Sequence, residues 1–307
     1  MSQRILLIAN PGAAAGRAAK RWEELLSELR RRNLRFDYVI TERPRQGVTL
    51  AQEASSKYDV IAAVGGDGTM NEVANGILLA GETKTALAVI PFGTGNDLAR
   101  MIGIRSVEDA LDALARGASR QTDAIEVSCQ EQGKPTKHFA LLYAAVGFAG
   151  EVGKRTTRTV KAIFGTRFCY SAGFFRALFT FESPTMRVRC GEQAFEGRMF
   201  LVSAAKAEVI GGGAMRLSPG ARMDDGKLTV NIVGNLGRLE TLRCFPRLVK
   251  GTHVTHPKVN CFAASSLTVE SEPAVELQLD GELLGRTPAS FEVKPKAIGV
   301  VTTRISE

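Results

Sequence analysis

The sequence predicts two domains: an N-terminal α/β domain built on a parallel sheet, and a C-terminal all-β sandwich. The chain has 307 residues, which is more than a single hydrophobic core usually serves. Residues 1–125 alternate short apolar runs with stretches of helical periodicity, the pattern of a mostly parallel sheet covered by helices. After Asp123 the runs become β-like and are separated by turns, which favours a sandwich or a strongly curved sheet.

The elements of the first domain follow from this alternation. Short apolar runs predict strands, and apolar residues at helical spacing predict helices, as where Trp22, Leu25 and Leu29 share one face. The predicted strands are residues 5–9, 36–40, 60–64 and 86–90. The predicted helices are residues 18–32, 47–55 and 71–79, one that begins near Asn96, and 107–116. We expect this domain to comprise residues 1–125.

The second domain is expected over residues 126–290. Its predicted strands are residues 125–129, 138–144, 186–190, 195–203, 228–233, 267–270 and 275–279. A helix-rich insertion is expected at about residues 152–182. The last apolar run, residues 297–302, could join either domain, and we expect residues 291–307 to form a C-terminal strand that returns to the first.

Composition and charge exclude several classes of protein. Apolar residues make up 44% and charged residues 23%, which excludes wholesale disorder, collagen, a disulfide miniprotein and a multi-span membrane protein. The five cysteines are scattered without a Cys-x-x-Cys pair, so neither a disulfide framework nor a structural zinc site is expected. The apolar run at 5–9 is too short for a signal peptide, and we expect a cytoplasmic protein. The net charge of +8 suggests an anionic partner, such as phosphate, nucleic acid or a lipid headgroup.

Three predicted strands end in loops rich in glycine and small polar residues, at 10–17, 65–72 and 91–97. The carboxyl ends of parallel strands meet at one sheet edge, where glycines and helix N-termini can approach a phosphate. Asp67 and Asp97 lie inside these loops and would repel a phosphate unless Mg²⁺ bridged the two. The alternative is that each aspartate merely caps its helix.

These motifs resemble a known family. Gly65-Gly-Asp67-Gly-Thr-x-Asn-Glu72, Pro91-x-Gly-Thr-Gly-Asn-Asp97, Asp225-Gly and Asp280-Gly-Glu282 together resemble the bacterial diacylglycerol kinase-like lipid kinases of the YegS/BmrU type. The resemblance covers nearly the whole chain and implies an α/β domain like that of diacylglycerol and NAD kinases, followed by a β-sandwich. It also implies an active site in the cleft between the two domains.

The resemblance implies the following site residues. Contacts to ATP would come from Asn10, Arg17, Thr41, Gly66, Asp67, Gly68, Thr69, Met70, Asn71, Glu72, Thr94 and Asp97. A structural Mg²⁺ would be held by the Asp225 side chain and the backbone carbonyls of Arg222 and Lys227. Glu282 is the first choice for the proton acceptor and Asp280 the second.

Two segments depart from the family pattern. Leu142-Tyr-Ala-Ala145 stands where the family often has an asparagine in the strand. Ala204-Ala-Lys206-Ala207 stands where it often has an asparagine before the triple-glycine segment. Both departures lie in the substrate domain, so they bear on the identity of the lipid more than on the kinase chemistry.

The functional hypothesis is an ATP-dependent lipid kinase that acts on diacylglycerol and serves phospholipid biosynthesis. Basic and aromatic residues are interleaved over residues 154–181, which suits peripheral contact with an anionic membrane, although these aromatics could instead form core. No RNP-like strand or recognition helix indicates nucleic acid. An NAD kinase and a catalytically silent nucleotide-binding membrane regulator are the alternatives, and a homodimer is left open.

Overall fold

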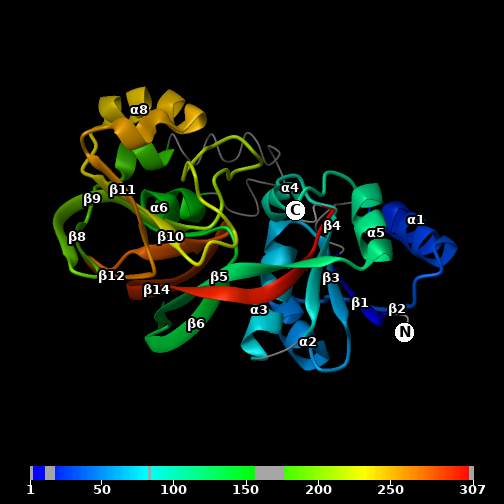
Figure 1. Cartoon of the computed structure of the whole chain (residues 1–307). Helices are drawn as coiled ribbons and strands as arrows, with labels where there is room; N and C mark the ends of the chain where they lie inside the picture. The colour runs from blue at the N-terminus through cyan, green and yellow to red at the C-terminus, as the bar shows by residue number, and fades with distance from the viewer. Residues whose placement is uncertain (1–2, 11–17, 82–83, 156–175, 304–307) are drawn as a thin grey trace. The chain divides into compact units, whose positions relative to one another are not determined.

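The protein is described by a computed structural model that covers residues 3–10, 18–81, 84–155 and 176–303 (Figure 1). The chain forms two compact units. The first unit comprises Met1–Asp123 and Lys296–Glu307, and the second comprises Ala124–Pro295. The first unit therefore combines both ends of the chain, while the second is one continuous segment.

The first unit contains a parallel sheet in the strand order β4-β3-β1-β2. Its strands are β1 (Ile5–Ala9), β2 (Phe36–Ile40), β3 (Val60–Gly65) and β4 (Ala86–Pro91). Every residue of β1, β3 and β4 is buried, whereas β2 at the edge is partly exposed. Continuous apolar runs are typical of parallel strands covered on both faces, so the predicted α/β class is confirmed for this unit.

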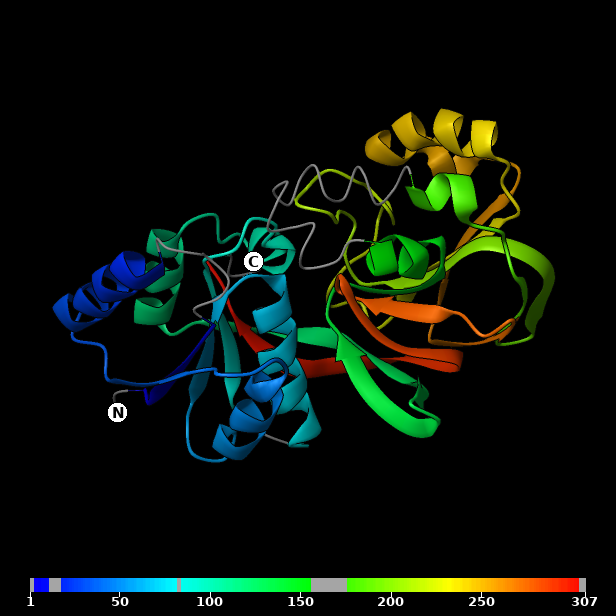
Figure 2. The same cartoon turned by 180° about the vertical axis from the view of Figure 1, so that it is seen from behind.

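Among the residues that the structure describes, five helices pack around this sheet: α1 (Ala18–Arg31), α2 (Gln46–Ala54), α3 (Asp67–Leu79), α4 (Asp97–Met101) and α5 (Val107–Arg116). Helices α2 and α3 cover one face of the sheet, and α1 and α5 lie on the other (Figures 1 and 2). Arg32, just after α1, holds α1 to α5 because its guanidinium binds Glu28, Glu108 and Asp112. The Ser106–Asp109 capping box starts α5 and Gly117 ends it.

The second unit is built of antiparallel strands. They are β5 (Ser119–Glu131), β6 (Lys134–Ala140), β7 (Tyr143–Gly147), β8 (Thr185–Cys190), β9 (Gln193–Ala205), β10 (Leu228–Gly234), β11 (Val259–Ala264), β12 (Ser266–Glu272), β13 (Glu276–Leu279) and β14 (Glu282–Val301). Strands β7, β9, β8, β12, β14 and β13 pair in a closed ring. The inward side chains of this ring form one apolar core that includes Val146, Val188, Val202, Val269 and Phe291. The end of β14 belongs to the first unit, where Gly299 and Val300 pair in parallel with β4.

Helices of the second unit differ most from the sequence expectations. The described helices here are α6 (Phe148–Arg155), a turn at residues 176–180, α8 (Arg238–Lys250) and the 3₁₀ helix η2 (Thr252–Thr255). Sequence analysis missed α8, which contains Pro246. Most of the expected insertion, residues 156–175, lies outside the described residues. In the part of the chain that the structure covers, no helix is long and apolar enough to cross a membrane.

The prediction of one continuous strand over residues 138–144 was wrong, because this range contains the end of one strand and the start of another. Strand β6 ends at Ala140 and β7 begins at Tyr143. The backbone N–H groups of Leu141, Leu142 and Tyr143 all donate to the carboxylate of Asp280, far along the chain. Because these donors point to a side chain, they are not available to a neighbouring strand at the break.

Candidate active site

Asn10, Thr41 and Gly66 lie at one edge of the parallel sheet, each directly after a strand. The Asn10 N–H donates to the Val64 carbonyl at 3.1 Å, and the Thr41 N–H donates to the Ala9 carbonyl at 2.8 Å. These bonds extend the hydrogen-bonded pairing of β1 with β2 and with β3 by one residue. The segments that follow β1, β2 and β3 therefore begin side by side. The structure thus brings together segments that the sequence assigned to one site.

The two glycine loops after β3 and β4 touch through their backbones. The N–H groups of Phe92 and Gly93 both donate to the Gly65 carbonyl, at 2.8 and 3.1 Å. A Cβ atom placed on Gly93 would lie 2.5 Å from the Cα of Gly66, closer than real Cβ contacts allow. No larger residue fits at position 93 with this backbone, and at Gly66 and Gly93 the two loops meet through main-chain atoms.

Asp67 holds the second of these loops. Its carboxylate accepts the N–H of Asn96 at 2.8 Å and the N–H of Asp97 at 2.7 Å, at the start of α4. Burial raises the pKa of Asp67, while the hydrogen bonds from Asp97 and Asn96 act in the opposite direction. Asp67 therefore caps α4, although it is itself the first residue of α3.

Glu72 has a similar role one turn further along α3. Its carboxylate accepts the backbone N–H groups of Arg45 and Gly47, each at 3.1 Å, at the start of α2. Arg45 has a φ of 64°, so α2 begins from a left-handed turn that lacks a side-chain cap of its own. The two acidic residues of the first motif thus join α3 to the N-termini of two other helices.

The remaining predicted nucleotide contacts differ in exposure. Thr69, Met70 and Asn71 have buried side chains, so Met70, which is 1% exposed, could reach a ligand only through its backbone. Gly68 is half-buried and Thr94 is exposed. Arg17 and most of the loop at 10–17 lie outside the described residues.

In the second unit, Asp280 and Glu282 have different environments. Asp280 is 8% exposed, and its carboxylate accepts three backbone N–H groups at 2.8 to 2.9 Å, from Leu141, Leu142 and Tyr143. Its own N–H donates to the Tyr143 carbonyl, and its φ of 48° makes the turn between β13 and β14. Glu282, the first residue of β14, has an exposed side chain. Asp280 therefore builds the turn that presents Glu282.

The three predicted metal ligands do not fit a metal ion. The ammonium group of Lys206 donates to Asp225 Oδ1 at 2.5 Å and to the Lys227 carbonyl at 2.6 Å. Partial burial opposes the charge on Asp225, but the bonds from Lys206 and from the Lys227 N–H outweigh it and lower the pKa of Asp225. Two of the expected oxygen ligands thus already bind a cation.

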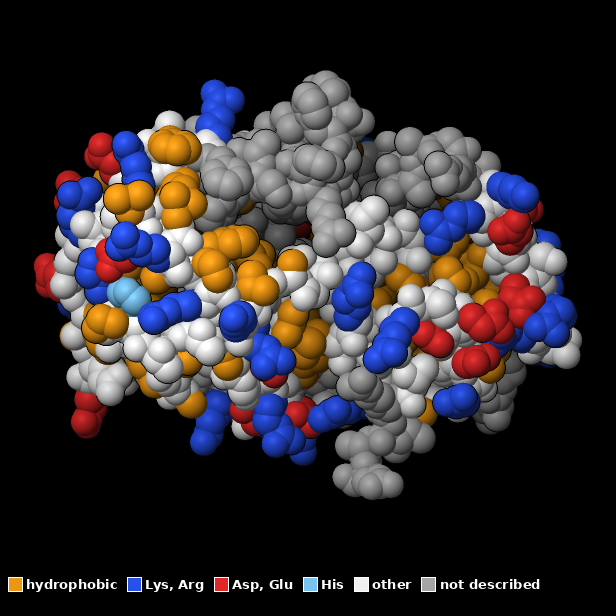
Figure 3. All heavy atoms as spheres, turned by 90° about the horizontal axis from the view of Figure 1, so that it is seen from above, with side chains coloured by type: hydrophobic (Ala, Val, Ile, Leu, Met, Phe, Trp, Pro, Cys, Tyr) orange, Lys and Arg blue, Asp and Glu red, His pale blue; other side chains and the backbone are white. Residues whose placement is uncertain are grey.

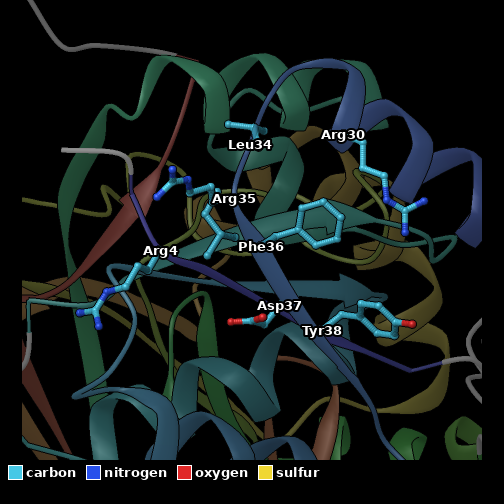
Figure 4. Close-up of a pocket in the computed structure, with 8 residues that line it drawn as sticks. Arg4, Arg30, Leu34, Arg35, Phe36, Asp37 and Tyr38 are labelled. Carbon is cyan, nitrogen blue, oxygen red and sulfur yellow. The ribbon is translucent and has the colours of Figure 1, made fainter.

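A shallow pocket lies elsewhere on the first unit (Figure 4). Arg4, Ile5, Arg30, Leu34, Arg35, Phe36, Asp37 and Tyr38 line it. These residues lie around the amino ends of β1 and β2, whereas Asn10 and Thr41 follow the carboxyl ends of the same strands. None of the predicted site residues lines this pocket, so it is not the candidate site.

Two family descriptions match the chain. The diacylglycerol kinase catalytic domain matches residues 4–127, and the YegS C-terminal NAD kinase beta sandwich-like domain matches residues 143–302. Together they account for both units and confirm the predicted combination of an α/β domain with a β-sandwich.

Curated relatives match over nearly the whole chain. A diacylglycerol kinase of Staphylococcus haemolyticus is 30% identical over 302 residues, which cover 97% of this chain and 88% of that protein. A diacylglycerol kinase of Staphylococcus saprophyticus is 29% identical and covers 95% of this chain and 92% of its own length.

Solved structures share the fold. A putative diacylglycerol kinase from Bacillus anthracis superimposes with a TM-score of 0.80 at 24% identity, over 98% of this chain and 95% of that one. Yeast NADH kinase superimposes with a TM-score of 0.56 at 10% identity, over 99% of this chain and 84% of that one.

Proposed function

The chain belongs to the diacylglycerol kinase-like lipid kinase family, and from this premise we propose that it transfers the γ-phosphoryl group of ATP to a lipid hydroxyl. Diacylglycerol is the leading acceptor, which would make phosphatidic acid the product. The observation that carries the proposal is the meeting of the strand-end segments at Asn10, Thr41, Gly66 and Gly93 on one sheet edge.

That edge suits a nucleotide phosphate chain. Gly66 and Gly93 have no side chains of their own to cover the backbone, and α3 begins directly after Gly66. A helix N-terminus offers free N–H groups and a partial positive charge to an anion. ATP would arrive as its magnesium complex, and the protein's own part would be to position the phosphates and the acceptor.

Glu282 is the proposed proton acceptor. A general base must reach the substrate hydroxyl, and the Glu282 side chain is exposed. Asp280 is the weaker choice because three backbone N–H groups already bind its carboxylate. We assign Asp280 to positioning: it fixes the turn from which Glu282 projects.

Because the proposed acceptor is a membrane lipid, the protein would work as a peripheral protein at the cytoplasmic membrane surface. The segment first expected to make this contact, residues 154–181, lies mostly outside the described residues. The second unit offers another candidate for that contact, the helix α8.

The decisive experiment is phosphoryl transfer from labelled ATP. The protein is incubated with Mg²⁺ and either diacylglycerol in mixed micelles or NAD, and the lipid and nucleotide fractions are counted. Label in the lipid supports the proposal. Label only in NADP would overturn it in favour of the NAD kinase alternative, and label in neither fraction would favour a silent regulator.

A pair of variants tests the assignment of the base. Glu282→Gln should lower transfer roughly 10²–10⁴-fold while leaving ATP binding unchanged, because only the proton acceptor is lost. The matched control is Glu292→Gln, which changes another exposed glutamate on the same strand. Equal loss of binding and turnover in Glu282→Gln would refute the assignment.

A further inference from the structure

Lys206 is a buried cation in the second unit. Its side chain is 0% exposed, and it follows directly after β9. A buried ammonium group is costly unless oxygen atoms surround it. Here Asp225 Oδ1 lies 2.5 Å and the Lys227 carbonyl oxygen 2.6 Å from the Lys206 nitrogen. Lysine thus supplies a positive charge to the turn at residues 222–227.

The same oxygen atoms are those that the family resemblance assigns to a structural Mg²⁺. Mg²⁺ needs its oxygen ligands at about 2.0–2.1 Å in near-octahedral arrangement. An ammonium group within hydrogen-bond distance of two of these oxygens occupies the space in which the ion would lie. A lysine at position 206 and a metal ion at Asp225 therefore exclude each other.

We propose that Lys206 replaces the structural divalent cation of this family in the present chain. One covalently attached charge neutralises Asp225 and satisfies the Lys227 carbonyl. The turn at 222–227 then folds without a metal, and its stability does not depend on Mg²⁺. The inference concerns how the second unit is built, so it stands whether or not the chain is a lipid kinase.

The position of Lys206 also connects this turn to the Asp280 turn. The backbone N–H of Lys206 donates to the Leu142 carbonyl at 2.8 Å, and the Leu142 N–H donates to Asp280 Oδ1 at 2.9 Å. A single residue, Leu142, thus lies between Lys206 and the turn that presents Glu282. We expect loss of the Lys206 charge to disturb both turns.

The test is thermal unfolding of the full chain without nucleotide, in EDTA and in excess Mg²⁺. The wild type should unfold at the same temperature in both. Lys206→Asn removes the charge and frees space, so it should lower the midpoint by roughly 5–10 °C in EDTA, and Mg²⁺ should restore part of this loss. Lys206→Met fills the space without a charge, so its melting midpoint should be lowered by the same amount in EDTA and in excess Mg²⁺.

Manganese binding to the wild type gives a second measurement. In the nucleotide-free wild type, electron paramagnetic resonance should detect no Mn²⁺ bound at Asp225. A site at Asp225 would be identified by its loss in Asp225→Asn. A wild-type Mn²⁺ site lost in Asp225→Asn, or a wild type that melts earlier in EDTA and recovers in Mg²⁺, would overturn the proposal.

A separate observation concerns the surface of α8. Four large apolar side chains of this helix are exposed: Leu239 (71%), Leu242 (39%), Phe245 (38%) and Val249 (48%). Phe179 is exposed as well (58%), and its carbonyl accepts the Arg238 guanidinium at 2.8 Å, which places it beside the helix. Thr241 is buried and marks the opposite, inward side.

Basic residues accompany this apolar row. The exposed cations of α8 are Arg238, Arg243, Arg247 and Lys250. Its acidic residue, Glu240, is paired with Lys258 at 2.7 Å and caps the helix at Gly237. Figure 3 shows hydrophobic and Lys/Arg side chains interspersed over the part of the second unit where α8 lies.

We infer that α8 docks on an anionic lipid surface. An exposed apolar row beside arginine and lysine is typical of a helix that lies in the membrane interface, with the cations at the headgroups. Charge complementarity favours lipid over a second copy of this basic chain. The inference agrees with the proposed lipid substrate, but it requires no kinase activity.

Vesicle co-sedimentation without ATP tests this surface. The protein should bind vesicles that contain phosphatidylglycerol and bind pure phosphatidylcholine vesicles weakly. Arg243→Gln with Arg247→Gln should lower the affinity roughly 30-fold, and Leu239→Ser with Phe245→Ser should also release the protein. The control Tyr38→Ser, an exposed aromatic residue of the first unit, should bind as the wild type does.

Two results would overturn the docking inference. Unchanged vesicle binding by both double variants would remove α8 from the contact. A self-association in solution that Leu239→Ser with Phe245→Ser abolishes, without any vesicle binding, would make the same face a protein interface. Loss of transferase activity with vesicle binding intact would count against the proposed function and not against docking.

Discussion

The carboxylate of Asp67 accepts the backbone N–H of Asp97 at 2.7 Å, which joins the first residue of α3 to the first residue of α4. The second oxygen accepts the N–H of Asn96 at 2.8 Å. One side chain therefore fixes the loop that follows β4. An aspartate in a phosphate-binding type of loop need not bind a cation, because it can be neutralised by main-chain donors instead.

Replacement of Asp67 by asparagine should loosen this loop. Asparagine offers one acceptor oxygen, and its NH₂ group would face the second backbone donor, which is then left unpaired. We expect a loss of about 1–3 kcal/mol in the free energy of unfolding and weaker ATP binding. Urea unfolding and calorimetry with ATP measure the two. Wild-type stability with lost ATP binding would instead indicate a direct role for Asp67 at the ligand.

Gly93→Ala tests the backbone contact between the two glycine loops. The added Cβ would lie 2.5 Å from the Cα of Gly66, so one of the loops must move. We expect ATP affinity to fall at least tenfold, measured by calorimetry. Gly237→Ala is the matched control, since a Cβ there meets nothing within 4 Å and its φ of −71° suits alanine. Unaltered ATP binding by Gly93→Ala would place the nucleotide elsewhere.

The first unit was the more predictable from sequence. Its strands β1, β3 and β4 are continuous short apolar runs, and such runs between helical stretches indicate a parallel sheet. The start of α3 was placed four residues late, at Asn71, because glycines on both sides of Asp67 suggested an extended loop. The helix in fact begins at Asp67.

The second unit was less predictable, since distant residues determine it. The break between β6 and β7 depends on Asp280, which lies 139 positions after Leu141. Helix α8 was missed because its apolar residues face solvent and Pro246 argues against a helix. The sequence signal for Lys206 was indirect, because the segment Ala204-Ala-Lys206-Ala207 departs from the family pattern, and only the structure places its nitrogen on Asp225 and Lys227.

A pH experiment tests the ion pairs at the end of α1. Hydrogen bonds from Arg31 and Arg32 lower the pKa of Glu28 from its ordinary 4.5 to about 2. A carboxylate with a depressed folded-state pKa stabilises the fold above its unfolded pKa, and that contribution is lost as the pH falls through the folded pKa. The difference in melting midpoint between the wild type and Glu28→Gln should therefore have its full size above about pH 5. It should shrink towards zero as the pH falls from 4.5 to 2.

The control for that experiment is Glu24→Gln on the same helix. Glu24 is 62% exposed and lies 3.9 Å from Lys20, so its ion pair contributes little. Its melting midpoint should follow that of the wild type at every pH. A Glu28→Gln difference that persists unchanged to pH 2 would contradict the charged contact with Arg31 and Arg32.

Variants of Asp280 and Glu282 should have different effects when stability and turnover are measured on the same proteins. Asp280→Asn replaces a carboxylate that accepts three backbone N–H groups, so we expect a loss of about 2–4 kcal/mol in the free energy of unfolding. Glu282→Gln changes an exposed side chain and should alter stability by less than about 0.5 kcal/mol, while turnover falls by roughly 10²–10⁴. Urea unfolding and phosphoryl transfer to lipid measure the two effects. A stable but inactive Asp280→Asn beside an active Glu282→Gln would reverse the roles, because the buried carboxylate would then have to leave its backbone partners to accept the proton.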